Sequence, residues 1–160
     1  MITTRHRGGE RGALVWRILV SAQLEARALA RGILDSISDE RLVLRVPGTP
    51  YRLHLVPTVA AAQISTAPGK RIKGTIEARA LRAHTAEGGG RFIEPIDGAP
   101  RIVAGAVIAV DTEQDRVLID VAVPMWISLQ PPQQAADFAN GALLNCYIES
   151  GATFTPVGSS

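Results

Sequence analysis

The chain has few of the residues from which a reading of function usually starts. Of its 160 residues, one is cysteine and seven are aromatic. A single thiol, Cys146, cannot form a disulfide within the chain, so the fold does not depend on oxidation. Seven aromatic rings are few for a protein that stacks many bases. No apolar run approaches the eighteen or so residues of a membrane-spanning helix, so no such segment is expected.

Motifs of catalysis and metal binding are also missing. The sequence holds no GxSxG, no P-loop and no GxGxxG. The histidines His6, His54 and His84 lack the spacing of a zinc site, and strand alternation predicts that Cys146 points inward as a small core residue. We therefore expect no catalysis, no metal and no cofactor.

The start of the chain resembles a secretion signal only faintly. Basic residues precede an apolar stretch and then Ala26-Arg27-Ala28. Arg17 interrupts the stretch and Glu25 stands before the cleavage-like site, and neither fits a signal peptide. We expect a cytoplasmic protein.

What the sequence does contain is an internal repeat. Residues 41–46 read RLVLRV and residues 116–121 read RVLIDV; residues 50–57 (PYRLHLVP) likewise match residues 124–131 (PMWISLQP). A glycine follows in each copy, and Ile-Glu then recurs at the same distance, as Ile76-Glu77 and Ile148-Glu149. Self-similarity at fixed distances predicts two copies of one small unit.

The pattern within each copy predicts an all-β fold. Strand-like segments of five to eight residues recur at regular spacing between glycines and prolines, which is typical of barrels and sandwiches. The order of three strands, a short helix and a further strand resembles the OB-fold layout, in topology only and without a diagnostic motif. We expect two tandem homologous small β-barrels, or one duplicated barrel, with short helices between strands.

The repeat and the composition also predict the domain boundaries. We expect a flexible basic arm at residues 1–12, a first repeat at 13–87, a glycine-rich linker at 88–91 and a second repeat at 92–160. Residues 21–31 are ambiguous. Their Ala, Leu, Glu and Arg content favours a short amphipathic helix, but Glu25–Leu29 (EARAL) recurs within a strand-like segment at residues 77–81. We favour a strand.

The two halves differ in charge. Residues 1–91 hold 15 Lys and Arg against 7 Asp and Glu, whereas residues 92–160 hold 2 against 8. The net charge of +2 therefore conceals a basic first repeat and an acidic second one. Such asymmetry suggests a polyanionic partner or self-assembly through opposite charges.

Strand alternation predicts which side chains form each outer face. For the first repeat these are cationic and candidates for nucleic-acid binding: Arg41, Arg45, Arg52, His54, Lys73 and Arg79. For the second repeat the candidate interface is Asp120, Trp126 and Tyr147, with Trp126 aligned to Arg52. Trp126 can pack under the linker or N-terminal segment, contact another subunit, or stack on a base, and all three remain open.

Two carboxylates recur at the same site of the repeat. Glu77 and Glu149 could meet across a pseudo-twofold axis as an acid/base pair. A residue kept in both copies more often has a structural role, such as pairing with Arg79.

Two hypotheses of function follow. The first is a non-catalytic binding module for a polyanion, single-stranded nucleic acid, that uses the basic outer face of the first repeat. The second is a self-assembling scaffold, a homo-oligomer in which that basic face contacts the acidic, Trp126-bearing face of the second repeat.

Overall fold

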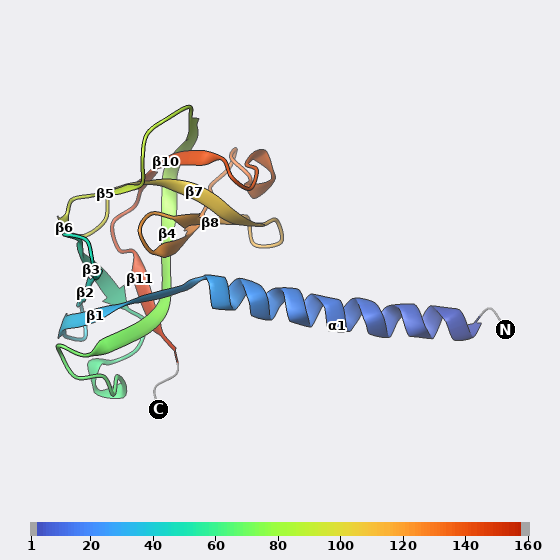
Figure 1. The fold of residues 1–160 in the computed structure, drawn as a ribbon, viewed down its shortest axis with the longest axis horizontal. Helices are drawn as coiled ribbons and strands as arrows, with labels where there is room; N and C mark the ends of the chain where they lie inside the picture. Colours follow the sequence, from blue (N-terminus) through green and yellow to red (C-terminus); the bar gives the residue numbers. More distant parts are fainter. Residues whose placement is uncertain (1–2, 158–160) are drawn as a thin grey trace.

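Strands are the main secondary structure of the protein. A computed structural model describes residues 3–157. Eleven strands form one mixed sheet in this part of the chain, preceded by a single long helix (Figure 1). The all-β class predicted from the sequence is confirmed. The elements are α1 (Thr3–Arg27), β1 (Leu29–Ile37), β2 (Leu42–Arg45), β3 (Arg52–Pro57), η1 (Ala61–Gln63), β4 (Arg71–Ala86), β5 (Phe92–Glu94), β6 (Asp97–Gly98), β7 (Ile102–Asp111), β8 (Arg116–Asp120), β9 (Pro124–Ser128), η2 (Ala135–Asp137), β10 (Leu143–Ile148) and β11 (Thr153–Pro156).

Alternation of side chains explains why these segments are strands. In β3, Leu53 and Leu55 are buried while Arg52 is exposed and His54 half-buried. A half-buried sheet requires this period of two. The two short helices expected between strands are present as the 3₁₀ turns η1 and η2.

The long strand β4 joins two sets of strands. Its first half pairs with β1 and β11, its second half pairs with β10, and its middle residues, 77–79, pair in parallel with β9. Figure 1 shows β4 running through both sets. The first strand set is β1, β2, β3, β11 and the first half of β4; the second strand set is β7, β8, β9, β10 and the second half of β4. In both sets the succession of pairings starts at β4 and returns to β4.

The two sets also exchange strands. The chain reaches β11 after completing the second set, yet β11 pairs with β3 and β4 in the first set. Buried side chains of both sets, among them Leu44, Phe154, Ile119 and Ile127, belong to one hydrophobic cluster. Residues 88–91 thus connect β4 to β5 within a continuous core and do not separate two independent bodies.

Residues 3–27 form a helix, which corrects two expectations. Residues 3–12 were expected to be an arm without regular structure, and a strand was favoured for residues 21–31, but that strand begins only at Leu29. No strand pairs with residues 12–27 among the described residues, and a helix satisfies its backbone groups internally. Figure 1 shows α1 extending away from the strands. Near its end, Leu24 packs on the sheet and the Nη2 of Arg27 donates to the carbonyl of Ile108 at 2.5 Å.

The strand registers do not support the alignment of Trp126 with Arg52 that the sequence repeat predicts. Arg45 of β2 lies opposite Arg52, and Asp120 of β8 lies opposite Pro124. If Arg45 corresponds to Asp120, then Arg52 corresponds to Pro124. Trp126 consequently corresponds to His54, two residues from the position predicted by the sequence. Because the shift is even, the inner and outer faces are unchanged.

Candidate anion-binding groove

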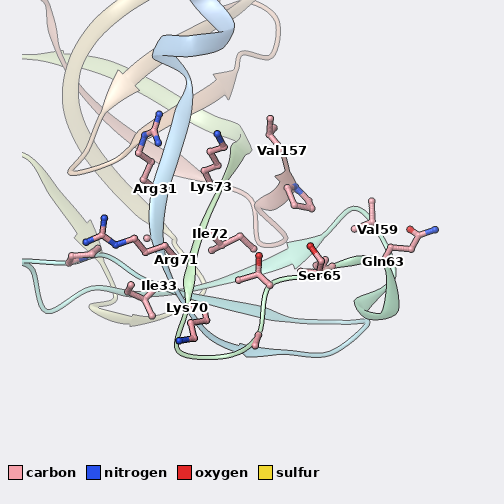
Figure 2. A pocket seen from close by; sticks show the side chains of 16 residues that line it. Arg31, Ile33, Val59, Gln63, Ser65, Lys70, Arg71, Ile72, Lys73 and Val157 are labelled. Atoms are coloured by element: carbon pink, nitrogen blue, oxygen red, sulfur yellow. The ribbon is translucent and has the colours of Figure 1, made fainter. Parts of the chain in front are cut away.

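Four cationic residues line one groove of the first strand set. The groove has a volume of about 870 Å³ and runs between the start of β4, β1, the segment around η1 and the last described residues. Figure 2 shows the side chains that line it. Its cations are Arg31, Lys70, Arg71 and Lys73.

The strand register brings these cations together. β1 and β4 are antiparallel, with Arg31 opposite Lys73 and Ile33 opposite Arg71. Side chains directly opposite each other share a face and lie about 5 Å apart at Cβ. In Figure 2 the side chains of Arg31 and Lys73 point the same way from neighbouring strands. Arg45 lies opposite Ile33 on the other side of β1, so it borders the same face.

The charge of this groove is uncompensated. No Asp or Glu lines the groove in the part of the chain that the structure describes. Among the side chains that the structure describes, no ion pair within 4.0 Å involves any of the four cations. Arg31, Lys70 and Arg71 are exposed and Lys73 is half-buried, so the charges reach water. Like charges held opposite each other repel, and a bound anion would relieve that repulsion.

The other predicted cations lie elsewhere. Arg52 forms an ion pair with Asp35 and another with Asp97 at 3.3 Å; the Nε2 of His54 lies 2.7 Å from the Oδ1 of Asp97. These two carboxylates neutralise that part of the predicted basic face. Arg41 is exposed just before β2. Of the six residues predicted, the structure brings Lys73 into the groove and Arg45 to its border.

Sequence reading missed Arg31, Lys70 and Arg71. Arg31 ends the segment 21–31, in which composition favours a helix and the recurrence of EARAL favours a strand. A strand starting at Leu29 would have placed Arg31 on an outer face by simple alternation. No local signal shows that Arg31 lies opposite Lys73, because their strands are separated by β2, β3 and η1.

Trp126 is covered by the N-terminal segment, the first of the three alternatives for this side chain. It is 4 % exposed and clusters with Leu118, Ala28 and Leu24 at the end of α1. The guanidinium carbon of Arg116 lies 3.9 Å from the ring centroid. Its ring therefore has no free face for a base. Of the other residues predicted for that interface, Asp120 accepts from the Nη1 of Arg91 at 2.6 Å and Tyr147 is 48 % exposed.

The repeated carboxylates are each engaged with a neighbour. The Oε1 of Glu77 accepts from the Nη1 of Arg116 at 3.0 Å, and the Oε1 of Glu149 accepts from Gln130 at 3.1 Å. The Nε of Arg79 lies 4.0 Å from the Oε2 of Glu149. Both carboxylates line a smaller cavity of about 290 Å³. These contacts explain both glutamates structurally.

Cys146 is a core residue. It is fully buried, and burial raises the pKa of its thiol from 9.0 to about 12. Because only the thiolate is a strong nucleophile or metal ligand, this side chain is inert near neutral pH. Within the described residues, no three His, Cys, Asp or Glu side chains cluster as a metal site would require.

Comparisons with known proteins were made along the whole chain. No protein-family model matches it, and neither the curated proteins nor the solved structures gave a match. The groove must therefore be interpreted from its own chemistry.

Proposed function

We propose that the protein is a binding module for a polyanion, namely single-stranded nucleic acid, and that the groove of the first strand set holds its phosphates. The observation that carries the proposal is the presence of Arg31, Lys70, Arg71 and Lys73 in one groove without a compensating carboxylate among the described residues. Arg45 at the border extends the cationic surface. Neutralising several phosphates by Lys and Arg supplies most of the affinity of sequence-independent binding.

The lining residues favour contacts with phosphates over contacts with bases. Apart from its cations, the groove is walled by aliphatic and small polar side chains such as Val59, Ile64 and Ser65. No aromatic side chain lines it in the described chain, and base stacking needs such rings. A flexible single strand can follow a groove of this size. We propose binding without base preference and without a catalytic step.

We also infer that the two strand sets are copies of one small five-stranded barrel that share β4. Each set has a register shift at the corresponding place, between Leu34 and Ser36 in β1 and between Val107 and Ala109 in β7. Gly32 and Gly105 support the inference further. A Cβ on Gly32 would meet the carbonyl oxygen of Arg45, and one on Gly105 would meet that of Asp120.

The scaffold hypothesis in its original form has lost most of its support. It joined the basic face to an acidic face that bears Trp126. That ring is covered by the protein's own helix, and Asp120 pairs with Arg91. Of the three residues proposed for that contact, Tyr147 remains exposed.

The test is a binding titration with a fluorescent single-stranded oligonucleotide at low salt. The variant Arg31→Glu/Lys73→Glu reverses two charges in the groove. We expect it to weaken binding at least tenfold, because it removes two phosphate contacts and introduces repulsion.

A matched control separates the groove from net charge. Arg82→Glu/Arg101→Glu changes the net charge equally, and both arginines are exposed. Arg82 is nine residues along β4 from Lys73, or about 30 Å. We expect the control to weaken binding less than about threefold. Equal weakening by both variants, or no binding by the parent protein, would refute the proposal. Tight binding of heparin without binding of the oligonucleotide would support anion binding by the groove but exclude nucleic acid as the ligand.

A further inference from the structure

The central turns of α1 expose an unusual amount of apolar surface. Five large side chains there are each more than half exposed: Leu14 (61 %), Val15 (56 %), Trp16 (67 %), Ile18 (61 %) and Leu19 (52 %). Together they leave on the order of 500 Å² of apolar surface in water, as much as the largest patch of a typical monomer. Such a block normally marks a contact.

These side chains cover more than half of the helix circumference. Successive residues are about 100° apart, so Leu14 and Ile18 share one side, Val15 and Leu19 the next, and Trp16 lies beyond them. The apolar arc thus spans about 200°, whereas a helix that packs on a single surface needs an apolar stripe of about 100°. Arg17 and Ser21 occupy the remaining side. An arc of this width can pack against two neighbouring surfaces at once.

An isolated helix of this kind is not expected to be stable. Helices in water draw most of their stability from packing of an apolar face. Here residues 12–19 are exposed, and contact with the strands begins only at Leu24. The missing packing must come from outside the chain.

We infer that α1 assembles with the α1 helices of other copies into a bundle of three or more chains. A single partner helix would cover one stripe and leave the rest of the arc in water. In a bundle each helix contacts two neighbours, which matches the width of the arc and allows all of its roughly 500 Å² of apolar surface to be buried. The side with Arg17 and Ser21 faces outward.

A lipid surface is the competing environment for such an arc. No helix of the described residues is long and apolar enough to cross a membrane. A helix that lies in the lipid interface carries many Lys and Arg on its polar side. Along residues 12–23, before the helix reaches the strands, the described side chains of that side are Ala13, Arg17 and Ser21, which carry a single positive charge. The observations favour other copies of the chain.

The test is the molar mass of the full chain measured by light scattering after size exclusion, over a range of concentrations. We expect at least three times the 17.0 kDa of one chain. Leu14→Glu/Ile18→Glu should run at the mass of one chain, because it places charges in the bundle. The control Leu81→Glu alters an equally exposed leucine (61 %) on β4 and should keep the mass of the parent.

Several outcomes would overturn the inference. A parent of one or two chains at every concentration excludes the bundle. An unchanged mass for Leu14→Glu/Ile18→Glu, with strand content preserved by circular dichroism, excludes α1 as the contact, and so does dissociation of Leu81→Glu. A parent of one chain that floats with phosphatidylcholine or phosphatidylglycerol vesicles, when Leu14→Glu/Ile18→Glu does not, assigns the helix to lipid.

Discussion

The two strand sets share a core pattern but differ in their outer faces. In the first set the outer positions around the groove hold Arg31, Arg45, Arg71 and Lys73. When the pairing of β7 with β8 and β10 is compared with that of β1 with β2 and β4, the equivalent positions of the second set hold Ala104, Asp120, Leu143 and Asn145. The inner positions stay aliphatic in both, as Leu42, Leu44, Val117 and Ile119 show. Packing restricts the core, so the specific chemistry lies in the outer residues that differ.

The sets also differ in the strands that pair with β1 and with β7. In the second set the short strand β5 pairs with β7, with Phe92 opposite Ala104. The corresponding stretch of β1 contains Arg31, and within the described residues only β2 and β4 pair with β1. The second set therefore has an added edge strand beside β7. Within the described residues, no strand pairs with the Arg31 stretch of β1 on that side.

Gly32 and Gly105 each lie close to a carbonyl of the neighbouring strand, and substituting them by alanine should destabilise the protein to different extents. Gly105→Ala should cost about 3 kcal/mol or more of the free energy of unfolding, because its Cβ would overlap the rigid carbonyl of Asp120. Gly32→Ala should cost less, because its Cβ would lie 2.7 Å from both the Arg45 oxygen and the flexible Leu44 side chain. Urea unfolding measures both. Gly88→Ala, in open space, is the neutral control, and an equally small cost for Gly105→Ala would contradict the close approach of Gly105 to that carbonyl.

Arg41, just before β2, and Arg116, the first residue of β8, provide the next comparison. Arg116 bonds Asp111 and Glu77, each at 3.0 Å, and covers Trp126, whereas Arg41 is exposed. Arg116→Ala should cost about 2 kcal/mol, because it leaves the half-buried Asp111 without its partner. Arg41→Ala should stay within about 0.5 kcal/mol of the parent. Similar losses in thermal unfolding for both would refute this assignment.

The buried thiol of Cys146 predicts that the free energy of unfolding depends on pH. Its folded-state pKa of about 12 lies above the unfolded value of 9.0, so the folded state keeps a proton that the unfolded state loses. The stabilisation is complete below pH 9 and is lost as the pH rises from about 9 to 12. At about pH 10 the loss is about 1.4 kcal/mol. Cys146→Ala should remove this component from a urea series, and an identical pH slope in parent and variant would contradict it.

The sequence predicted the local pattern well and the long-range contacts poorly. Alternation identified the inner faces of β3 and β8 and placed Cys146 inside, because burial on a strand has a period of two. Alternation could not predict the secondary structure of the pentapeptide EARAL. At its first occurrence, residues 25–27 end α1, whereas at its second occurrence residues 77–81 lie within β4. Identical local sequences adopt the structure that their neighbours provide.

The groove shows the same limit. Lys73 was identified from its strand, but its partners depend on the pairing of β1 with β4, which follows two intervening strands. The return of β11 to the first set and the parallel pairing of β9 with β4 likewise connect residues distant in sequence. Such contacts depend on the packing of the whole core, so the residues next to each strand in the sequence do not predict them.

The salt dependence of oligonucleotide binding tests the central claim most directly. For a single strand, the slope of log affinity against log salt falls by about 0.7 for each phosphate contact removed. We expect Arg31→Glu/Lys73→Glu to reduce the magnitude of this slope by about 1.4, and Arg82→Glu/Arg101→Glu to leave it as in the parent. An unchanged slope for the groove variant, or the same reduction in the control, would contradict the assignment of phosphate binding to the first strand set.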